Sequence, residues 1–286
     1  MSIHIIGSNS YIAKRLIHRL DSHDSVCSSV IKYAKSGNDN CLRLDLMDES
    51  SYSSLLINKN DYVVILAAIS SPDACESDYE LAYAINVIGT GRLIDIALSA
   101  GAKVLFLSSD TVLGEVHAAT DETYLANPFG VYAKMKYEIE QKYKAHSNFK
   151  VFRLSYVFSC TDKFTSFISQ CYESKAVANV FNTLFRNVIY VEDVVEAIIK
   201  LYEKFDMFDN YLFHIVGERL LSRFDIATEL KTQVWNSLII NIEEPPLGFL
   251  TKRPSVIYAK SLYLQQLLGR APTPFIDAIK REFRKD

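Results

Sequence analysis

The sequence is poor in glycine and has neither an excess of basic residues nor a long apolar run. Its 286 residues include 10 glycines, about half of the roughly 20 expected at average usage. Lys and Arg total 31 against 34 Asp and Glu, a net charge of −3, so a basic surface that follows nucleic acid is not expected. The longest wholly apolar stretch, residues 62–69, has eight residues, whereas a helix that spans a bilayer needs about 20. Neither a nucleic-acid partner nor a membrane is expected.

The cysteines form no recognisable set. They include no C-x-x-C pair and no cluster with histidine that would bind metal, and they stand at Cys27, Cys41, Cys75, Cys160 and Cys171. An odd number with this spacing is typical of an intracellular chain with reduced thiols, so we expect no metal site. The chain opens directly into the apolar run Ile3–Ile6, without the basic lead-in and longer apolar core of a secretion signal. We therefore expect a cytoplasmic protein.

Short apolar runs alternate with amphipathic helical patterns in the first half of the chain. Uninterrupted apolar strands between helices indicate a parallel sheet that is covered on both faces. We predict an α/β fold, with a Rossmann-type doubly wound parallel sheet over residues 1–155. The expected strands are residues 3–6, 29–33, 62–66, 104–107 and 151–154, and the expected helices are residues 10–20, 79–100 and 132–146.

The second half, residues 156–286, is predicted to be mainly a smaller α/β substrate-binding part, with some segments returning to the main sheet. No low-complexity linker separates the halves, so we expect them to pack tightly, with the ligand cleft between them at the carboxyl ends of the strands. The expected helices are residues 164–173, 191–204, 222–230, 260–268 and 274–284, and the expected strands are residues 188–191, 212–216 and 239–242.

The turn after the first strand is a candidate phosphate-binding turn. Glycines in such a turn allow backbone N–H groups and a helix N-terminus to approach a pyrophosphate. Read as G-x-x-G-x-x-G, the turn retains Gly7 but has Ser10 and Ala13 in place of the other two glycines. Ser10 adds a side chain where the cofactor must come near. An ordinary turn into an N-capped helix fits the same residues.

The segment after the second strand favours NADPH over NADH. No carboxylate stands where it would hold a free ribose 2′-hydroxyl; Lys32 and Lys35 lie there instead, and lysines can accept a 2′-phosphate. Solvated surface charges are the alternative interpretation. Asp45, in the stretch Leu44–Leu46 that is expected to end the third strand, is placed to reach an adenine amino group.

Tyr132 and Lys136 form a Y-x-x-x-K pair on one face of a helix. A nearby ammonium favours the phenolate, which would lower the tyrosine pKa toward the range useful for proton exchange with a carbonyl. The preceding strand ends in hydroxyl groups at Ser108 and Ser109. A serine there can hydrogen-bond the substrate oxygen that the tyrosine protonates.

These motifs resemble those of the extended short-chain dehydrogenases/reductases, the NAD-dependent epimerase/dehydratase superfamily, which act on nucleotide-sugars. Nearly the whole chain is covered. Within the superfamily, residues 77–86, the Ser109-Asp110 pair and the ending from Arg253-Pro254 to Gly269 are most similar to the dTDP-4-dehydrorhamnose reductases and related 4-keto reductases. The resemblance is carried by residues 7–13, 45–46, 66–68, 86–90, 108–110, 132–136, 153–157, 186–194 and 253–254.

The resemblance implies the roles of the site residues. Ser109, Tyr132 and Lys136 would form a catalytic triad, with Lys136 also holding the nicotinamide ribose. Arg186 and Arg253 would bind the diphosphate of a sugar nucleotide, because a planar guanidinium can bind two phosphate oxygens at once. The expected cofactor-binding residues are Gly7, Ser10, Tyr11, Ile12, Lys32, Lys35, Asp45, Leu46, Ala67, Ala68, Asn86, Ser108, Tyr132 and Lys136, and the expected substrate-binding residues are Ser70, Asp110, Thr111, Arg186 and Arg253.

The activity expected from this resemblance is NADPH-dependent reduction of the 4-keto group of a nucleoside-diphosphate 4-keto-6-deoxy sugar, for a deoxysugar of a surface polysaccharide. One alternative is an epimerase or dehydratase with tightly bound NAD, although Thr111 stands where dehydratases place the second residue of an acid pair. Another is a non-catalytic, cofactor-binding regulatory subunit. A homodimer is expected from the resemblance alone.

Overall fold

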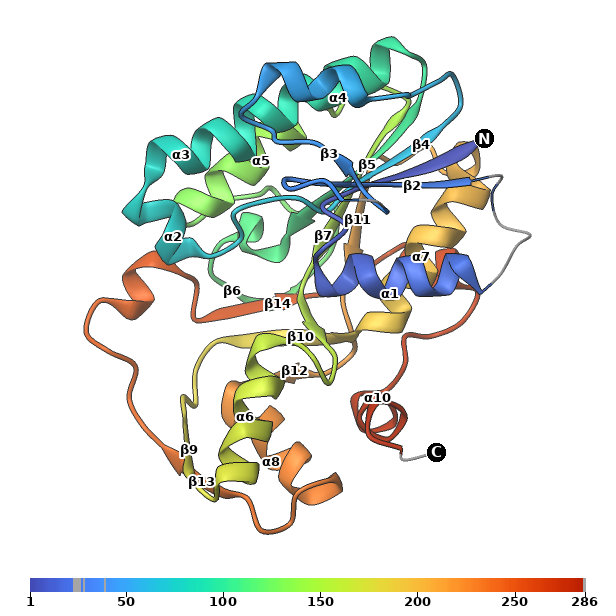
Figure 1. Ribbon diagram of the computed structural model, residues 1–286. Coiled ribbons are helices and arrows are strands. Elements are labelled where there is room, and N and C mark those ends of the chain that lie inside the picture. The colour runs from blue at the N-terminus through green and yellow to red at the C-terminus, as the bar shows by residue number, and fades with distance from the viewer. Residues whose placement is uncertain (23–26, 28, 39, 285–286) are drawn as a thin grey trace.

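The computed structural model describes residues 1–22, 27, 29–38 and 40–284. A parallel sheet with helices on both faces forms the larger part, and most of the second half of the chain forms a smaller part beside it (Figure 1). The described cysteines are all free thiols.

Within the described residues the main sheet has seven parallel strands in the order β11-β7-β5-β4-β1-β2-β3. The chain starts in the middle, moves outward to β3 and then crosses to β4 on the other side of β1, as in a Rossmann-type doubly wound sheet. The predicted fold class is therefore confirmed. The strands are β1 Ser2–Ile6, β2 Ser29–Ala34, β3 Leu42–Arg43, β4 Tyr62–Ile65, β5 Lys103–Ser109, β7 Phe149–Leu154 and β11 Leu212–Ile215.

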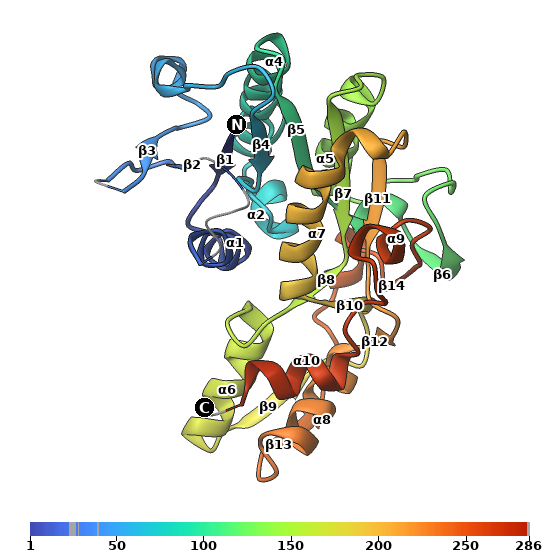
Figure 2. The same cartoon turned by 90° about the vertical axis from the view of Figure 1, so that its right-hand side faces the viewer.

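Each face of the main sheet carries its own apolar core, because successive strand side chains point to opposite faces. Ile5 belongs to the core beneath α1 (Tyr11–Asp21) and α7 (Val191–Lys204), and Ile6 belongs to the core beneath α4 (Thr90–Ser99) and α5 (Val131–Tyr143). Both pairs of helices are visible in Figure 2. Helix α7 and strand β11 come from the second half of the chain, which thus contributes to the main sheet.

The helix expected over residues 79–100 is interrupted by a π-helical turn. The structure has α3 (Tyr79–Tyr83), the π turn η2 (Ala84–Gly89) and then α4. The Thr90 hydroxyl donates to the carbonyl of Ile85 at 2.9 Å, five residues back. The wider turn accommodates Asn86, whose side chain binds both backbone groups of Ile69 at 2.9 and 3.0 Å. Asn86 thereby fixes the loop that follows β4.

Residues 79–99 are long and apolar enough to cross a membrane by length and composition alone. Half of the 18-residue apolar stretch in this segment is buried inside the protein. Leu93 and Ile94 of α4 belong to the core on their face of the main sheet. A buried core helix satisfies the same criterion, so the segment gives no independent indication of a membrane.

The smaller part contains a second sheet, β12-β10-β14-β6 with β8 paired to β10, and the separate pair β13-β9. Strands β6, β8, β9, β12 and β14 were not expected from the sequence. The expected strand 188–191 is longer and ends one residue earlier, and the expected helix 260–268 is confined to α9. The strands are β6 Val116–Thr120, β8 Tyr156–Phe158, β9 Val177–Val180, β10 Phe185–Tyr190, β12 Leu220–Leu221, β13 Ile239–Ile242 and β14 Val256–Ala259.

Short helices complete the chain. The helices of the smaller part and the remaining loops are α2 Pro72–Ser77, α6 Lys163–Ser174, α8 Arg223–Gln233, α9 Leu264–Leu268 and α10 Phe275–Glu282, with 3-10 turns at η1 Glu49–Ser54, η3 Asp110–Leu113, η4 Phe205–Met207 and η5 Phe249–Lys252. Helix α10 packs against α8 of the smaller part. The boundary between residues 155 and 156 stays a prediction.

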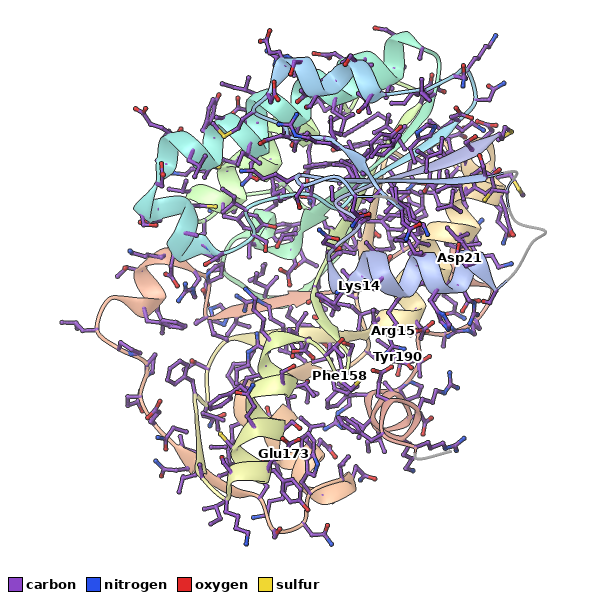
Figure 3. The ribbon with its side chains drawn as sticks, viewed as in Figure 1. Lys14, Arg15, Asp21, Phe158, Glu173 and Tyr190 are labelled. Atoms are coloured by element: carbon purple, nitrogen blue, oxygen red, sulfur yellow. The ribbon has the colours of Figure 1, made fainter. Side chains whose placement is uncertain are left out.

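Glu282 joins helix α10 to the larger part of the protein. Its carboxylate accepts hydrogen bonds from Arg15 of α1 at 2.7 Å, from Tyr190 at the end of β10 at 3.0 Å, and from the backbone N–H of Cys160 at 2.8 Å. Figure 3 labels Arg15 and Tyr190 between α1 and the smaller part. This buried carboxylate therefore holds segments from three distant stretches of the chain together.

His214 of β11 is buried as a neutral imidazole. Its Nδ1 lies 3.0 Å from the carbonyl oxygen of Lys260, so Nδ1 carries the proton, and its buried Nε2 has no hydrogen-bond partner among the described residues. Burial lowers the pKa of His214 from 6.5 to about 4, although the nearby Glu122 opposes the shift. Protonation would place a charge on a nitrogen that has no acceptor.

Replacing His214 by Asn should make stability less sensitive to acid. In the unfolded chain the imidazole takes up a proton below its ordinary pKa of 6.5, whereas in the folded protein it stays neutral down to about pH 4. The free energy of unfolding is therefore unaffected by His214 above pH 6.5 and decreases as the pH falls from 6.5 to about 4. At 1.36 kcal/mol per pKa unit the loss is about 3 kcal/mol. Urea unfolding at pH 7 and pH 4.5 should show a smaller decrease for His214→Asn than for the wild type. Equal decreases would contradict this account.

Candidate active site

Gly7 ends the first strand in a conformation that only glycine adopts easily. Its φ is +88°, and a Cβ at this position would lie 2.7 Å from the backbone nitrogen of Ala67. The absence of a side chain thus allows the turn after β1 to pass directly over the end of β4. The glycine that the sequence retains is the one that the backbone requires.

Ser10 occupies the position of the missing middle glycine and caps helix α1. Its φ of −68° and ψ of 153° are open to any residue, and its Oγ accepts a hydrogen bond from the N–H of Ala13 at 3.2 Å. The position therefore has no conformational need for glycine. The serine hydroxyl occupies one of the N–H groups that a phosphate could otherwise use.

A cavity of about 440 Å³ lies beside this turn, between the ends of β1, β2 and β4. It places seven of the expected cofactor-binding residues on one wall. Lys35 is among them, with its Nζ 3.7 Å from the carboxylate of Asp45. The structure corrects the expected end of the third strand, because β3 stops at Arg43 and Asp45 lies beyond it. The seven are Gly7, Ser10, Lys35, Asp45, Leu46, Ala67 and Ala68.

Lys32 differs from Lys35, and the structure does not place it on this wall. The side chains of a strand alternate between faces, and the Nζ of Lys32 points to Asp21 at the end of α1, 3.5 Å away. Of the two lysines, only Lys35 faces the cavity. Asn86 binds the backbone of Ile69 and so shapes the wall from behind.

A second cavity, of about 310 Å³, contains the expected catalytic residues. Ser109 reaches it from the carboxyl end of β5, and Tyr132 and Lys136 reach it from α5. The Nζ of Lys136 donates to the carbonyl of Leu107 at 2.8 Å and lies 5.9 Å from the centre of the Tyr132 ring. The structure therefore brings the three side chains to one cavity, where Ser108, Tyr11 and Ile12 also lie.

The electrostatics of this cavity differ from the expectation that Lys136 lowers the pKa of Tyr132. Burial raises the pKa of Tyr132, and the neighbouring Cys75 and Asp110 raise it further. Burial also lowers the pKa of Lys136 to about 8, against the attraction of Glu140. The phenol is consequently held in its protonated form, which suits a proton donor.

Glu140, which the sequence analysis missed, supports the catalytic helix from inside. It lies one turn beyond Lys136, is fully buried, and accepts hydrogen bonds from Ser108 at 2.5 Å and from Arg153 at 2.6 Å. These contacts bind α5 to both β5 and β7. The spacing Tyr132, Lys136, Glu140 on one helical face was the available signal.

The third cavity, of about 790 Å³, opens between the two parts of the protein. It shares Tyr11, Ser70 and Tyr156 with the second cavity, so the two cavities adjoin. Arg253 lies on its wall, 2.7 Å from the carboxylate of Asp73 and stacked on the ring of Phe249. The expected substrate residues Ser70 and Arg253 therefore both line this cavity.

The other three expected substrate residues lie behind the cavity wall. Asp110 is buried and accepts a hydrogen bond from Ser155 at 2.8 Å, with the Nε of Arg186 3.9 Å away. Thr111 donates to the Oγ of Ser109 at 2.9 Å. Arg186 donates to the backbone carbonyl of Pro254 at 2.6 Å, and to those of Phe185 and Ser255. Because Arg186 is turned toward the segment before β14, its guanidinium holds the backbone there.

Arg223, at the start of α8, is a cavity residue that sequence reasoning did not identify. Its guanidinium lies 4.0 Å from the centre of the Tyr156 ring and 4.8 Å from that of Phe164, on the wall of the third cavity. Its position after the helix cap Ser222 gives no signal of binding, because only the fold brings α8 to β8.

Comparisons with known proteins agree on the family. The family model described as the RmlD substrate binding domain matches residues 1–261. The chain is 26% identical over 222 residues to the methionine adenosyltransferase 2 subunit beta of Xenopus laevis, a match that covers 74% of this chain and 66% of that protein, just under two thirds of its length. It is 24% identical over 251 residues to the dTDP-4-dehydrorhamnose reductase of Aggregatibacter actinomycetemcomitans, covering 83% and 85% respectively.

One solved structure shows the same fold over the whole chain. A crystal structure of a dTDP-4-dehydrorhamnose reductase from Clostridium acetobutylicum has a TM-score of 0.83 and 21% identity, covering 99% of this chain and 98% of the other. At this identity the likeness concerns the arrangement of the backbone alone.

Replacing Glu140 by Gln should destabilise the protein. The substitution leaves the buried guanidinium of Arg153 without its counter-charge, and breaking a buried ion pair in this way costs about 3–5 kcal/mol. The free energy of unfolding in urea measures the effect. Glu138→Gln, on the exposed side of the same helix, is the matched control, with an expected change within about 0.5 kcal/mol. Similar losses in both variants would contradict a special role for Glu140.

Proposed function

The chain belongs to the family of the RmlD substrate binding domain, and on that premise we propose that it is a nucleotide-sugar oxidoreductase. The observation that carries the proposal is that three cavities meet at the N-terminus of α1. All three include Ser10 in their walls. A dinucleotide along the first and a sugar nucleotide in the third would meet in the second, beside Ser109, Tyr132 and Lys136.

The proposed reaction is the reduction of the 4-keto group of a nucleoside-diphosphate 4-keto-6-deoxy sugar. The nicotinamide cofactor, when bound, supplies the hydride. The protonated phenol of Tyr132 donates a proton to the substrate oxygen. Ser109 accepts hydrogen bonds from the N–H and the hydroxyl of Thr111 and donates a long one, of 3.4 Å, to Asp110. A substrate oxygen at a shorter distance would take over this hydrogen and be oriented by it.

Lys136 is assigned to the cofactor side of the same cavity. One of its three N–H groups is used by the carbonyl of Leu107, which leaves two for the hydroxyls of a nicotinamide ribose. Its contact with that carbonyl also fixes the direction in which the ammonium points. Gly7 and the N-terminus of α1 fit a pyrophosphate, because no side chain fills the turn between β1 and β4.

The epimerase or dehydratase alternative receives less support from the residues. A dehydratase would need an acid pair after Ser109, but Asp110 is buried against Ser155 and Thr111 binds the Ser109 hydroxyl. The regulatory alternative rests on the name of the Xenopus laevis relative, a subunit of methionine adenosyltransferase. A regulatory subunit would bind the cofactor without turnover, so an activity assay distinguishes it from a reductase.

The first test is NADPH oxidation with dTDP-, GDP-, UDP- and CDP-linked 4-keto-6-deoxy sugars. We expect turnover on at least one of them, and a decrease in kcat of about 10²–10⁴-fold in Tyr132→Phe, because the proton donor is lost. Tyr137→Phe, on the same helix, is the matched control and should retain activity. Cofactor binding without turnover on any sugar would contradict the reductase and favour the regulatory subunit.

A second test concerns the preference for NADPH. Lys35 is the one of the two candidate lysines that faces the adenine-side cavity, where it would pair with a 2′-phosphate. Lys35→Ala should raise KM for NADPH, by about 10-fold for one charged hydrogen bond, and leave KM for NADH nearly unchanged. Lys32→Ala, which removes the lysine facing Asp21, should change neither. A parallel rise for both cofactors in Lys35→Ala would overturn the assignment. The polysaccharide pathway, the homodimer and the cytoplasmic location stay predictions.

A further inference from the structure

Three arginines from separate segments lie at the third cavity, two on its wall and one behind it. Arg186 comes from β10, Arg223 from α8 and Arg253 from the segment before β14. They are close enough for the charges of Arg223 and Arg253 to contribute, after burial, to a lowered pKa of Arg186. Like charges gathered in a partly buried place repel one another unless anions lie between them.

Two of the three guanidinium groups are already engaged by the protein. Arg186 donates to three backbone carbonyls and lies beside Asp110. Arg253 pairs with Asp73 at 2.7 Å. Neither group depends on a ligand to satisfy its charge.

Arg223 is the exception. Its Nη1 is buried and has no hydrogen-bond partner among the described residues. Asp162, an acid on the same cavity wall, has other partners, because its carboxylate caps α6 at Phe164 and accepts the hydroxyl hydrogen of Tyr156 at 2.6 Å. A buried donor without an acceptor is unfavourable, and the side chain that carries it lines a cavity large enough for a ligand.

Two aromatic rings hold the guanidinium in place. Tyr156 and Phe164 contact it at 4.0 and 4.8 Å from their ring centres, a cation–π arrangement that restricts the plane of the group. A guanidinium whose plane is held in this way keeps its N–H edge ready for the two oxygens of a phosphate. Tyr156 also lines the second cavity, so Arg223 and Tyr132 lie on the walls of adjoining cavities.

We propose that Arg223, and not Arg186, is the arginine that binds the diphosphate of the nucleoside-diphosphate substrate. The inference rests on the proposed function, which places a sugar nucleotide in this cavity. Arg253 is the second cation on the wall and can release Asp73 to the solvent when a phosphate arrives, since that carboxylate is 65% exposed. Arg186 instead serves the fold, as the donor that holds the backbone before β14.

The test is calorimetric titration of the full chain with dTDP, GDP, UDP and CDP, which needs no turnover. Arg223→Met keeps an apolar stem between the two rings and removes the charge. It should weaken the diphosphate that binds best by about 10- to 100-fold, as expected for hydrogen bonds to a charged group. Arg219→Met is the matched control, because Arg219 is exposed, pairs with Glu229 and lies outside the cavity. Arg223→Lys should restore part of the affinity.

Thermal unfolding separates a binding role from a structural one. The unfolding temperature of Arg223→Met should stay unchanged or rise, because a half-buried cation whose buried Nη1 has no hydrogen-bond partner among the described residues is removed, whereas that of Arg186→Met should fall. Diphosphate binding that is unchanged in Arg223→Met would overturn the assignment of Arg223 and leave the proposed reductase intact. A wild-type protein that binds none of the diphosphates would overturn both the assignment and the nucleotide-sugar substrate.

Discussion

The buried contact between Glu140 and Arg153 is the constraint on which the catalytic geometry depends. It joins helix α5 to strand β7, and the hydrogen bond from Ser108 joins the same carboxylate to β5. Lys136 lies one helical turn away, where its ammonium meets the carbonyl of Leu107. The buried carboxylate of Glu140 and the ammonium of Lys136 thus each bind a fixed partner in the sheet. These contacts hold the face of α5 that carries Tyr132 and Lys136 in one position against the sheet.

Burial around that network also decides which protons are held. Removal from water raises the pKa of Tyr132 and lowers that of Lys136, so each group is pushed toward its uncharged form. An uncharged tyrosine keeps the proton that a reductase would deliver to the substrate oxygen. The same environment leaves little room for a permanently ionised tyrosine before a cofactor and substrate enter.

The three cavities are lined by different parts of the fold. The turn at Gly7 and the cap at Ser10 belong to the main sheet, whereas Arg223 and Phe164 belong to the smaller part. A ligand that reaches from one to the other must pass the catalytic residues. Relatives of this chain are named both as a reductase and as a regulatory subunit.

The order of apolar strands and helices was sufficient to predict the doubly wound sheet, because buried parallel strands leave a periodic signal in the sequence. The family resemblance likewise pointed to Ser109, Tyr132 and Lys136, which the fold does bring together. The short strands of the smaller part gave too little periodicity to be found. Side-chain partners were undetermined for a different reason: the commitment of Arg186 to backbone carbonyls and the unpaired guanidinium of Arg223 result from contacts between segments far apart in the chain. Tertiary structure alone decided that Arg223 and Arg253 line the cavity and that Arg186 does not, since a guanidinium is available to a ligand only when the surrounding fold has not already satisfied it.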